Sequence, residues 1–458
     1  MAETAEKETS EKSRIRHLIP LLIASIFLFC LIYFSIGAQA PILDKEMYGS
    51  PPENPRCPAE FEPAEAVLVR YPLFIPPKLV AELSKDVTVI TIVANSQEQE
   101  EAMQIYQVNN VTMQNVEFLF APTEGPWTRD YSPFFVFTEN GMELIDTTYK
   151  KERPGDNNIP LFYADAAHLP IHFMNLTHRG GNLISDGYGM AISTDLIDEA
   201  NPNFSIAEIK ELSEEYLGII EYHIVPDANG EYIQHIDCWA KLLAPNVLLI
   251  REVPSTHSQY DELEAAADYF SSQNSSYGTP FEVVRIHTPN NESYTNSLIV
   301  NNKVLIPLEG TEWDDDALEI YQEAMPGYEV IGFEELEEYP WLSTDSLHCR
   351  IREVPDSRML YIKHIPLQEG TTELEIQTEI IPYSGEEVTS AVVFYKIGES
   401  EWQTELLEPA TQNQYVATLP EQPPGTILYY YIYAEDNSGR GENNPYAGRE
   451  NPHFFVVG

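Results

Sequence analysis

The sequence predicts an α/β domain of five ββαβ units closed into a ring, followed by an all-β sandwich of the immunoglobulin type. Three observations support this fold class. A hairpin-like pattern recurs five times between residues 127 and 362, helix-like stretches separate its copies, and short alternating strands follow from about residue 367. The 458 residues suffice for two or three domains with cores of their own.

Each copy of the pattern has one or two polar residues, an apolar run, a turn and a second apolar run. The copies begin at Trp127, Arg179, His235, Tyr294 and Leu347, with turns expected at 139–141, 186–187, 244–246, 301–302 and 355–356. Their leading polar residues are Asp130, Asn182, Asp237, Asn296 and Cys349. Successive leading residues are 52, 55, 59 and 53 positions apart, which indicates five copies of one unit.

Helix-like stretches at 207–216, 260–271 and 315–325 separate the hairpins, each followed by a short strand such as 282–286. Five such units form either an open array or a ring. A ring would bring the five leading residues together at its axis.

The charge balance is strongly acidic, with 73 Asp and Glu against 26 Lys and Arg, a formal net charge of −47. Such a surface repels nucleic acid, so we expect no nucleic-acid partner, and it attracts small cations. Dispersed acidic residues also keep proteins soluble, so the charge permits a cationic substrate without requiring one.

The N-terminus predicts a membrane-directing segment at residues 18–36, which lack charge and follow Arg14 and Arg16. Residues 1–40 are therefore a signal peptide or a membrane anchor, and 41–55 a linker. Both readings place the rest of the chain outside the cytoplasm, with membrane contact only through this segment.

Cysteines are few. Loss of the leader would remove Cys30 and leave Cys57, Cys238 and Cys349, so at least one thiol stays unpaired. Cys349 stands between His348 and Arg350, and positive neighbours of this kind lower a thiol pKa and favour a nucleophile.

The ring would assemble groups suited to guanidinium chemistry. Asp130 and Asp237 can each accept two N–H donors from a planar guanidinium, Cys349 can attack its central carbon, and His235 can move protons. On a strand, His235 and Asp237 would project to one face. Because no CxxC or HxxxH spacing supports a metal site among these groups, we expect neither a metal nor a cofactor.

Four segments carry a family resemblance: GPWTRDYSPFFVF, HIDCWAKLLAP, YTNSLIVNNKVLIP and LHCRIREVPD. Over residues 56–362 the chain resembles the agmatine deiminase and bacterial peptidylarginine deiminase family, whose fold is a fivefold pseudosymmetric ββαβ propeller. The resemblance implies that Asp130 and Asp237 bind the guanidinium, that His235 is the general acid and base, and that Cys349 is the nucleophile. It further implies that Asn296 orients the reacting group, Trp127 stacks on the substrate stem, and the Gly180-Gly181-Asn182 turn, with Asn182 as a candidate contact, approaches the substrate.

The substrate prediction rests on TYKKERPGDNN after the first hairpin. This stretch lacks the Trp- and Gly-rich sequence typical of agmatine-acting members. In peptide-acting members two arginines clamp a terminal carboxylate, and Lys151 and Arg153 stand at the matching positions. Arginine-containing peptides are therefore the predicted substrate. Agmatine deimination, amidino transfer and a non-catalytic surface binding protein remain the alternatives.

The C-terminal region, residues 367–458, predicts strands at 373–381, 391–397, 414–417 and 427–434 separated by polar turns. It lacks the paired cysteines of antibody domains, so only a sandwich architecture is inferred. A similar sandwich follows the catalytic domain in secreted peptidylarginine deiminases.

Overall fold

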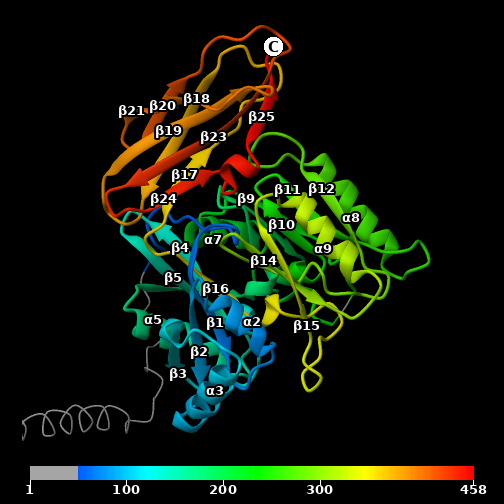
Figure 1. The fold of residues 1–458 in the computed structure, drawn as a ribbon. Helices are drawn as coiled ribbons and strands as arrows, with labels where there is room; N and C mark the ends of the chain where they lie inside the picture. Colours follow the sequence, from blue (N-terminus) through cyan, green and yellow to red (C-terminus); the bar gives the residue numbers. More distant parts are fainter. Residues whose placement is uncertain (1–49, 231) are drawn as a thin grey trace, which may run out of the picture. The chain divides into compact units, whose positions relative to one another are not determined.

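The computed structural model describes residues 50–230 and 232–458 (Figure 1). The predicted leader lies outside these residues, so its role and the expected location outside the cytoplasm remain predictions. No helix within the described ranges has the length and apolar character needed to cross a membrane.

Four sheets share one pairing pattern, in which two antiparallel strands are followed by a strand parallel to the second. In chain order they are β4 (Phe134–Thr138), β5 (Gly141–Thr148) and β6 (Ile171–Thr177); β7 (Ile184–Ser185), β8 (Met190–Thr194) and β9 (Glu221–Val225); β10 (Ala240–Ala244), β11 (Val247–Glu252) and β12 (Glu282–His287); β13 (Leu298–Val300), β14 (Lys303–Leu308) and β15 (Glu329–Glu334). The predicted hairpins at the first four turns are therefore confirmed.

A fifth sheet joins the two ends of this region. β16 (Arg352–Pro355) pairs antiparallel with β1 (Ala64–Arg70), which runs parallel to β2 (Thr88–Val93), and β3 (Val116–Phe120) completes the sheet. The hairpin predicted at 355–356 is wrong, because β17 (Leu360–His364) pairs instead with β18 (Glu375–Pro382). A local turn signal cannot show which distant strand offers the better edge. The arrangement of the five sheets as a pseudosymmetric propeller remains a prediction.

Helices lie in the connections between parallel strands of the sheets, as a parallel crossover requires. They include α2 (Pro77–Leu83), α3 (Ser96–Val108), α5 (Ile159–Ala167), α6 (Leu196–Glu199), α7 (Ile206–Leu217), α8 (Tyr260–Ser272) and α9 (Asp314–Ala324). The sequence predicted α7, α8 and α9 correctly. In α7, Ser205 and Glu208 form a capping box, and Gly218 ends the helix at φ +69°.

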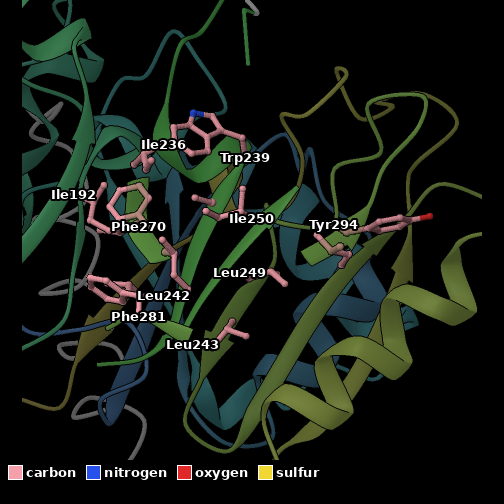
Figure 2. Close-up of a cluster of buried hydrophobic side chains, with 14 of the residues drawn as sticks. Ile192, Ile236, Trp239, Leu242, Leu243, Leu249, Ile250, Phe270, Phe281 and Tyr294 are labelled. Carbon is pink, nitrogen blue, oxygen red and sulfur yellow. The ribbon is translucent and has the colours of Figure 1, made fainter. Parts of the chain in front are cut away.

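A large apolar core supports the third unit (Figure 2). Leu242 on β10 lies on the same side of the sheet as Phe270 of α8, whereas Leu249 on β11 points to the other side; all three belong to this core. Ile236 and Trp239 are buried in the same core and stand on either side of Asp237 and Cys238. Burial of such side chains stabilises by about 1.5–3 kcal/mol each, so the short turn between them is firmly held.

The C-terminal strands form two sheets around one core. One has the order β17-β18-β22-β21, with β21 (Glu408–Thr411) and β22 (Gln414–Thr418). The other has the order β20-β19-β23-β24, with β25 paired to β23; its strands are β19 (Val388–Ile397), β20 (Gln403–Leu406), β23 (Ile427–Asp436), β24 (Gly441–Asn444) and β25 (His453–Val456). Alternate residues of β23 are buried, including Leu428, Tyr430 and Ile432. This is a sandwich of two sheets, and its immunoglobulin-like character remains a prediction.

Candidate active site

The leading polar residues of the five units lie in short turns before the first strand of each sheet. These turns are α4 (Thr128–Tyr131) and the 3₁₀ helices η4 (Gly180–Asn182), η5 (Ile236–Cys238) and η6 (His348–Arg350), while Asn296 lies in a turn before β13. The predicted strand for His235 and Asp237 is therefore wrong. Backbone hydrogen bonds from Cys238 to His235 (3.2 Å) and from Trp239 to Ile236 (3.1 Å) close a tight helical turn instead.

Hydrogen bonds link these five turns in a closed circuit, which brings residues far apart in sequence together. The donors and acceptors are Gly181 N to Asp130 Oδ1 (3.2 Å), Ile236 N to Asn182 Oδ1 (3.2 Å), Asn296 Nδ2 to the Asp237 carbonyl (3.3 Å), Cys349 N to Asn296 Oδ1 (3.2 Å) and Arg129 Nε to the His348 carbonyl (3.5 Å). The Oδ1 of Asn182 also accepts bonds from Thr194, so this oxygen holds neighbouring turns together.

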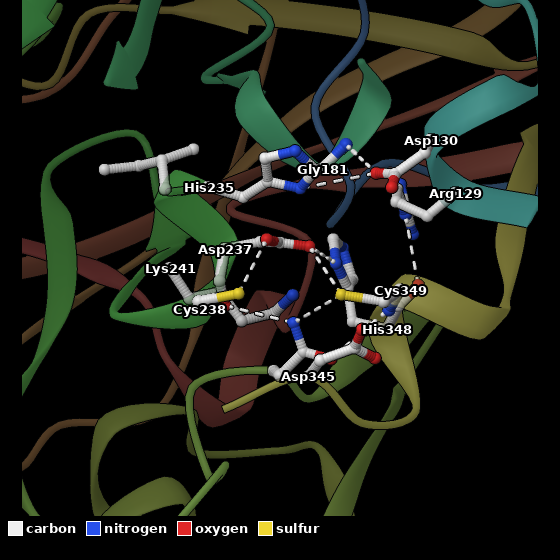
Figure 3. A network of polar contacts seen from close by, with 12 residues as sticks. Arg129, Asp130, Gly181, His235, Asp237, Cys238, Lys241, Asp345, His348 and Cys349 are labelled. Carbon is white, nitrogen blue, oxygen red and sulfur yellow. Dashed lines mark hydrogen bonds and ion pairs between the residues drawn. The ribbon is translucent and has the colours of Figure 1, made fainter. Parts of the chain in front are cut away.

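Three candidate catalytic groups converge on one point beside Gly181 (Figure 3). A Cβ added to Gly181 would lie 2.7 Å from Nδ1 of His235, 2.8 Å from Oδ1 of Asp130 and 3.0 Å from Oδ2 of Asp237. Glycine is therefore required there, as predicted from the Gly180-Gly181 pair. Asp130 and His235 are also in contact directly, with 3.4 Å between Oδ1 and Nδ1.

Cys349 faces the same point. Its Sγ lies 3.6 Å from Oδ2 of Asp237 and accepts a bond from Nδ2 of Asn296 at 3.2 Å. Burial raises the pKa of the Cys349 thiol well above its ordinary value, contrary to the expected lowering by basic neighbours. Burial outweighs the charge of Arg350, whose guanidinium donates to the carbonyls of Phe74 and Pro340.

The pKa values of the two aspartates, Asp130 and Asp237, are shifted in opposite directions. Burial, together with the charge of Asp237, raises the pKa of Asp130 to about 7. Burial also acts to raise the pKa of Asp237, but the hydrogen bond and charge of His348 outweigh it, and the pKa is lowered. Paired carboxylates with divergent pKa values are typical of sites that divide roles between them.

His235 is buried, and neither ring nitrogen has a hydrogen-bond partner within the described part of the chain. Burial lowers the pKa of His235 to about 3, so the ring is neutral near pH 7. A buried unpaired imidazole costs about 1–3 kcal/mol. Such a cost is typical of a functional site, where a substrate supplies the missing partner.

Glu60 and His348 are site residues that the sequence did not predict. His348 Nδ1 lies 2.7 Å from Oδ2 of Asp237, and its Nε2 lies 2.8 Å from Oε2 of Glu60. Lys241 Nζ and the backbone N of Ile299 also donate to Glu60, at 2.8 Å and 2.7 Å to Oε1. The position of His348 beside Cys349 was an available signal, whereas Glu60 lies in no motif.

Asp345 and Cys238 were also missed. Trp127 Nε1 donates to Oδ2 of Asp345 at 2.6 Å, and burial raises the pKa of Asp345 to about 7. The possible ligand atoms of Asp237, Cys238 and Cys349 lie within 4.8 Å of one another, a grouping that could hold a metal ion. The expectation that the protein uses no metal remains a prediction.

Basic side chains surround Trp127. The Arg153 guanidinium lies 4.9 Å from its ring centroid, and Lys150 Nζ lies 6.0 Å away. Burial and the charges of Arg179 and Arg153 lower the pKa of Lys150, which shows that these cations crowd together. The predicted Lys151 is exposed, and among residues 50–230 and 232–458 no carboxylate or ring contacts it. After β5 the chain turns so that Lys150, not Lys151, faces the indole.

A cysteine, a neutral imidazole and two carboxylates around one enclosed point are the groups that hydrolysis of a flat amidine cation requires. Over residues 56–355 the chain matches the model of the Porphyromonas-type peptidyl-arginine deiminase family, and it belongs to that family. It is accordingly a hydrolase acting on carbon–nitrogen bonds of linear amidines.

Curated relatives and solved structures agree with this assignment. Agmatine deiminase of Medicago truncatula is 24% identical over 324 residues, which cover 58% of this chain and 84% of the relative. The structure of agmatine deiminase of Enterococcus faecalis superposes with a TM-score of 0.59 at 20% identity, covering 68% of this chain and 98% of the other. The structure of C. jejuni agmatine deiminase superposes with a TM-score of 0.55 at 17% identity, covering 66% of this chain and 96% of the other.

Proposed function

We propose that the chain replaces one nitrogen of a guanidinium group by oxygen through a covalent intermediate on Cys349. The convergence of His235, Asp130 and Asp237 beside Gly181, with Cys349 3.6 Å from Asp237, is the observation that supports this most strongly. The two carboxylates would hold the planar cation by its N–H edges and direct its carbon toward sulfur.

The protonation states of Cys349 and His235 in the free site are compatible with this reaction. The high pKa of Cys349 keeps the thiol protonated until a cation arrives, and the bound guanidinium favours the thiolate. Neutral His235 can accept the thiol proton as the Sγ–C bond forms and pass it to the nitrogen that leaves as ammonia. It can then take a proton from water, whose oxygen bonds to the carbon as the S–C bond breaks, leaving a ureido product.

The central test is the Cys349→Ala variant of the purified protein. We expect no ammonia and no ureido product, together with an unchanged thermal unfolding midpoint. Mass spectrometry of wild-type protein quenched during turnover should show the mass of the substrate less one ammonia added to the Cys349 peptide. Product formation by the folded variant would refute the mechanism. Product formation by the wild type in buffer without an amine acceptor excludes amidino transfer, and inactive wild type would favour a binding protein.

Agmatine is the substrate that the curated relatives favour, which weighs against the peptide-arginine prediction. These relatives carry agmatine deiminase names at 21–25% identity. A small dication also suits the strongly acidic chain. We therefore propose agmatine as the first substrate to test.

Arginine with a free carboxylate is the second candidate, and one observation favours it. Lys150, Arg153 and Arg179 form a cationic group near Trp127 that would repel the amine of agmatine and attract a carboxylate. Among the described residues, Arg153 lies 3.8 Å from the carboxylate of Asp156, a long ion pair, so its guanidinium can donate to a further anionic partner.

The variants Arg153→Gln and Lys150→Gln separate the two substrates. If a carboxylate binds there, kcat/KM for peptides ending in arginine should fall about tenfold or more, while agmatine and C-terminally amidated peptides should be unaffected or improved. Lys151→Gln, an exposed neighbour, is the matched control. Wild-type turnover of agmatine far above that of every peptide would exclude the second candidate.

A further inference from the structure

Cys238 is a second buried thiol at the nucleophile, and the deimination chemistry gives it no task. Both sulfur atoms are directed to the same carboxylate (Figure 3). Cys238 Sγ lies 3.6 Å from Oδ1 of Asp237, and Cys349 Sγ lies 3.6 Å from Oδ2. The two sulfurs are themselves within 4.8 Å of each other.

These thiols come from separate turns, so a bond between them would join η5 to η6. Both turns are held on the same side by neighbouring residues: Thr295 Oγ1 donates to the Cys238 carbonyl at 3.1 Å, and Asn296 Oδ1 accepts from Cys349 N at 3.2 Å. Side-chain rotation therefore has only a short distance to cover before the sulfurs reach the bonding distance of about 2 Å.

We propose that Cys349 and Cys238 form an oxidative modification site, in which a hydroperoxide converts the pair to a disulfide. The Cys349 thiol gives its proton to His235 as the sulfur attacks the peroxide, the O–O bond breaks, and a sulfenic acid forms with release of water or an alcohol. The Cys238 thiol then attacks the sulfenic sulfur, the S–O bond breaks, a second water leaves and the S–S bond forms. Two electrons pass from the thiols to the peroxide, and a dithiol reductant returns them.

The disulfide has two consequences. It removes the nucleophile and places both sulfurs against Asp237, so it blocks deimination reversibly. It also stops Cys349 from passing to sulfinic acid, which thiols do not reduce. The effect on activity rests on the proposed function, whereas formation of the bond does not.

The third described thiol provides a control. Cys57 lies beside the Pro58 carbonyl, with its Sγ 3.8 Å from that oxygen, and is not in the group formed by Asp237, Cys238 and Cys349. The Cys57→Ser variant should therefore keep the oxidation behaviour of the wild type. Cys238→Ser changes one sulfur to oxygen and removes only the capacity to form this bond.

The experiment treats the reduced full chain with hydrogen peroxide in the presence of EDTA, so that metal binding by the same atoms does not interfere. After alkylation and digestion without reductant, wild type and Cys57→Ser should give a peptide joining Cys238 to Cys349, with a mass 2 Da below the sum of the thiols. Absence of that peptide in oxidised wild type would overturn the proposal.

Activity provides the second measurement, relative to each variant's own untreated sample. Wild type and Cys57→Ser should lose activity in peroxide and recover at least about 80% with dithiothreitol, whereas Cys238→Ser should recover little and accumulate sulfinic acid at Cys349. Equal recovery by Cys238→Ser would overturn the protective role. If no protein has deiminase activity but the joined peptide forms, the proposed function fails and the oxidation site stands.

Discussion

His348 and Asp237 share a hydrogen bond of 2.7 Å between Nδ1 and Oδ2, and the second nitrogen of the same ring lies 2.8 Å from Oε2 of Glu60. The ring therefore bridges the carboxyl groups of Asp237 and Glu60. The hydrogen bond and charge of His348 lower the pKa of Asp237, although burial alone would raise it. We infer that Glu60 acts on Asp237 through His348.

The variant Glu60→Gln tests this relay. Loss of the negative charge should weaken the hold of His348 on Asp237, raise the pKa of Asp237 and lower kcat/KM about tenfold to a hundredfold, as for other groups that orient a ligand from behind. The acidic limb of the kcat/KM profile should also move to higher pH. A purely structural role would leave the position of that limb unchanged.

Glu82→Gln is the matched control for this variant. Glu82 also binds lysine, with Lys303 Nζ 2.6 Å from its Oε1, but it belongs to α2. We expect its kcat/KM to stay within about twofold of wild type. A comparable loss in both variants would attribute the effect of Glu60 to general stability.

The pH dependence of kcat/KM should reveal the ionisation of Asp130 in the free enzyme. Its pKa is raised to about 7, so below that pH its carboxyl is protonated and cannot pair with a guanidinium. We expect kcat/KM to fall by up to about tenfold per pH unit below 7. In contrast, kcat should fall less, because a bound guanidinium lowers the pKa of Asp130. The measurement is initial ammonia release from pH 5 to 9, and a flat kcat/KM profile would exclude this role.

Gly181→Ala should abolish activity without unfolding the protein. The new Cβ would lie within 3.0 Å of His235, Asp130 and Asp237, where the substrate's planar group has to fit. Gly230→Ala is a contrasting glycine variant, since no atom lies within 4 Å of a Cβ at that position, although its φ of +61° adds backbone strain. Deimination at wild-type rates by Gly181→Ala would show that the substrate binds elsewhere.

Glu353→Gln should destabilise the protein by about 3–5 kcal/mol, because it leaves the buried Arg129 without its ionic partner. Glu264→Gln removes an ion pair to Arg285 that is more exposed, and should cost less than about 1 kcal/mol. Urea unfolding measures both.

Burial alone would raise the pKa of Glu353, but Arg129 lowers it. The ion pair therefore stabilises above the ordinary glutamate pKa, and its contribution is lost as pH falls through the lowered value.

Local sequence pattern predicted most of the elements that position the site. The helices at Ile206–Leu217, Tyr260–Ser272 and Asp314–Ala324 have a clear helical period, and four hairpins have turn residues between apolar runs. The near-constant spacing of Asp130, Asp237 and Cys349 also predicted that they would meet. Their roles in catalysis remain proposals.

Other features depended on groups far apart in the chain. The spacing of His235 and Asp237 suited a strand, yet the burial of Ile236 and Trp239 in one core holds them in a helical turn. The sequence placed Lys151 at the site, whereas the fold turns Lys150 toward Trp127. Burial of Cys349 reversed the expected shift of its pKa, because desolvation of a thiolate outweighs the charges of its basic neighbours.

The chain alone therefore determined the repeated unit and the residue types that its linked turns bring together, because both follow from periodicity and spacing. Tertiary structure decided that β16 pairs with β1, that Glu60 lies against His348, and that Cys238 lies beside Cys349. Pairing edges, desolvation and close contacts between distant turns are set by the packing of the whole domain, and no local pattern encodes them.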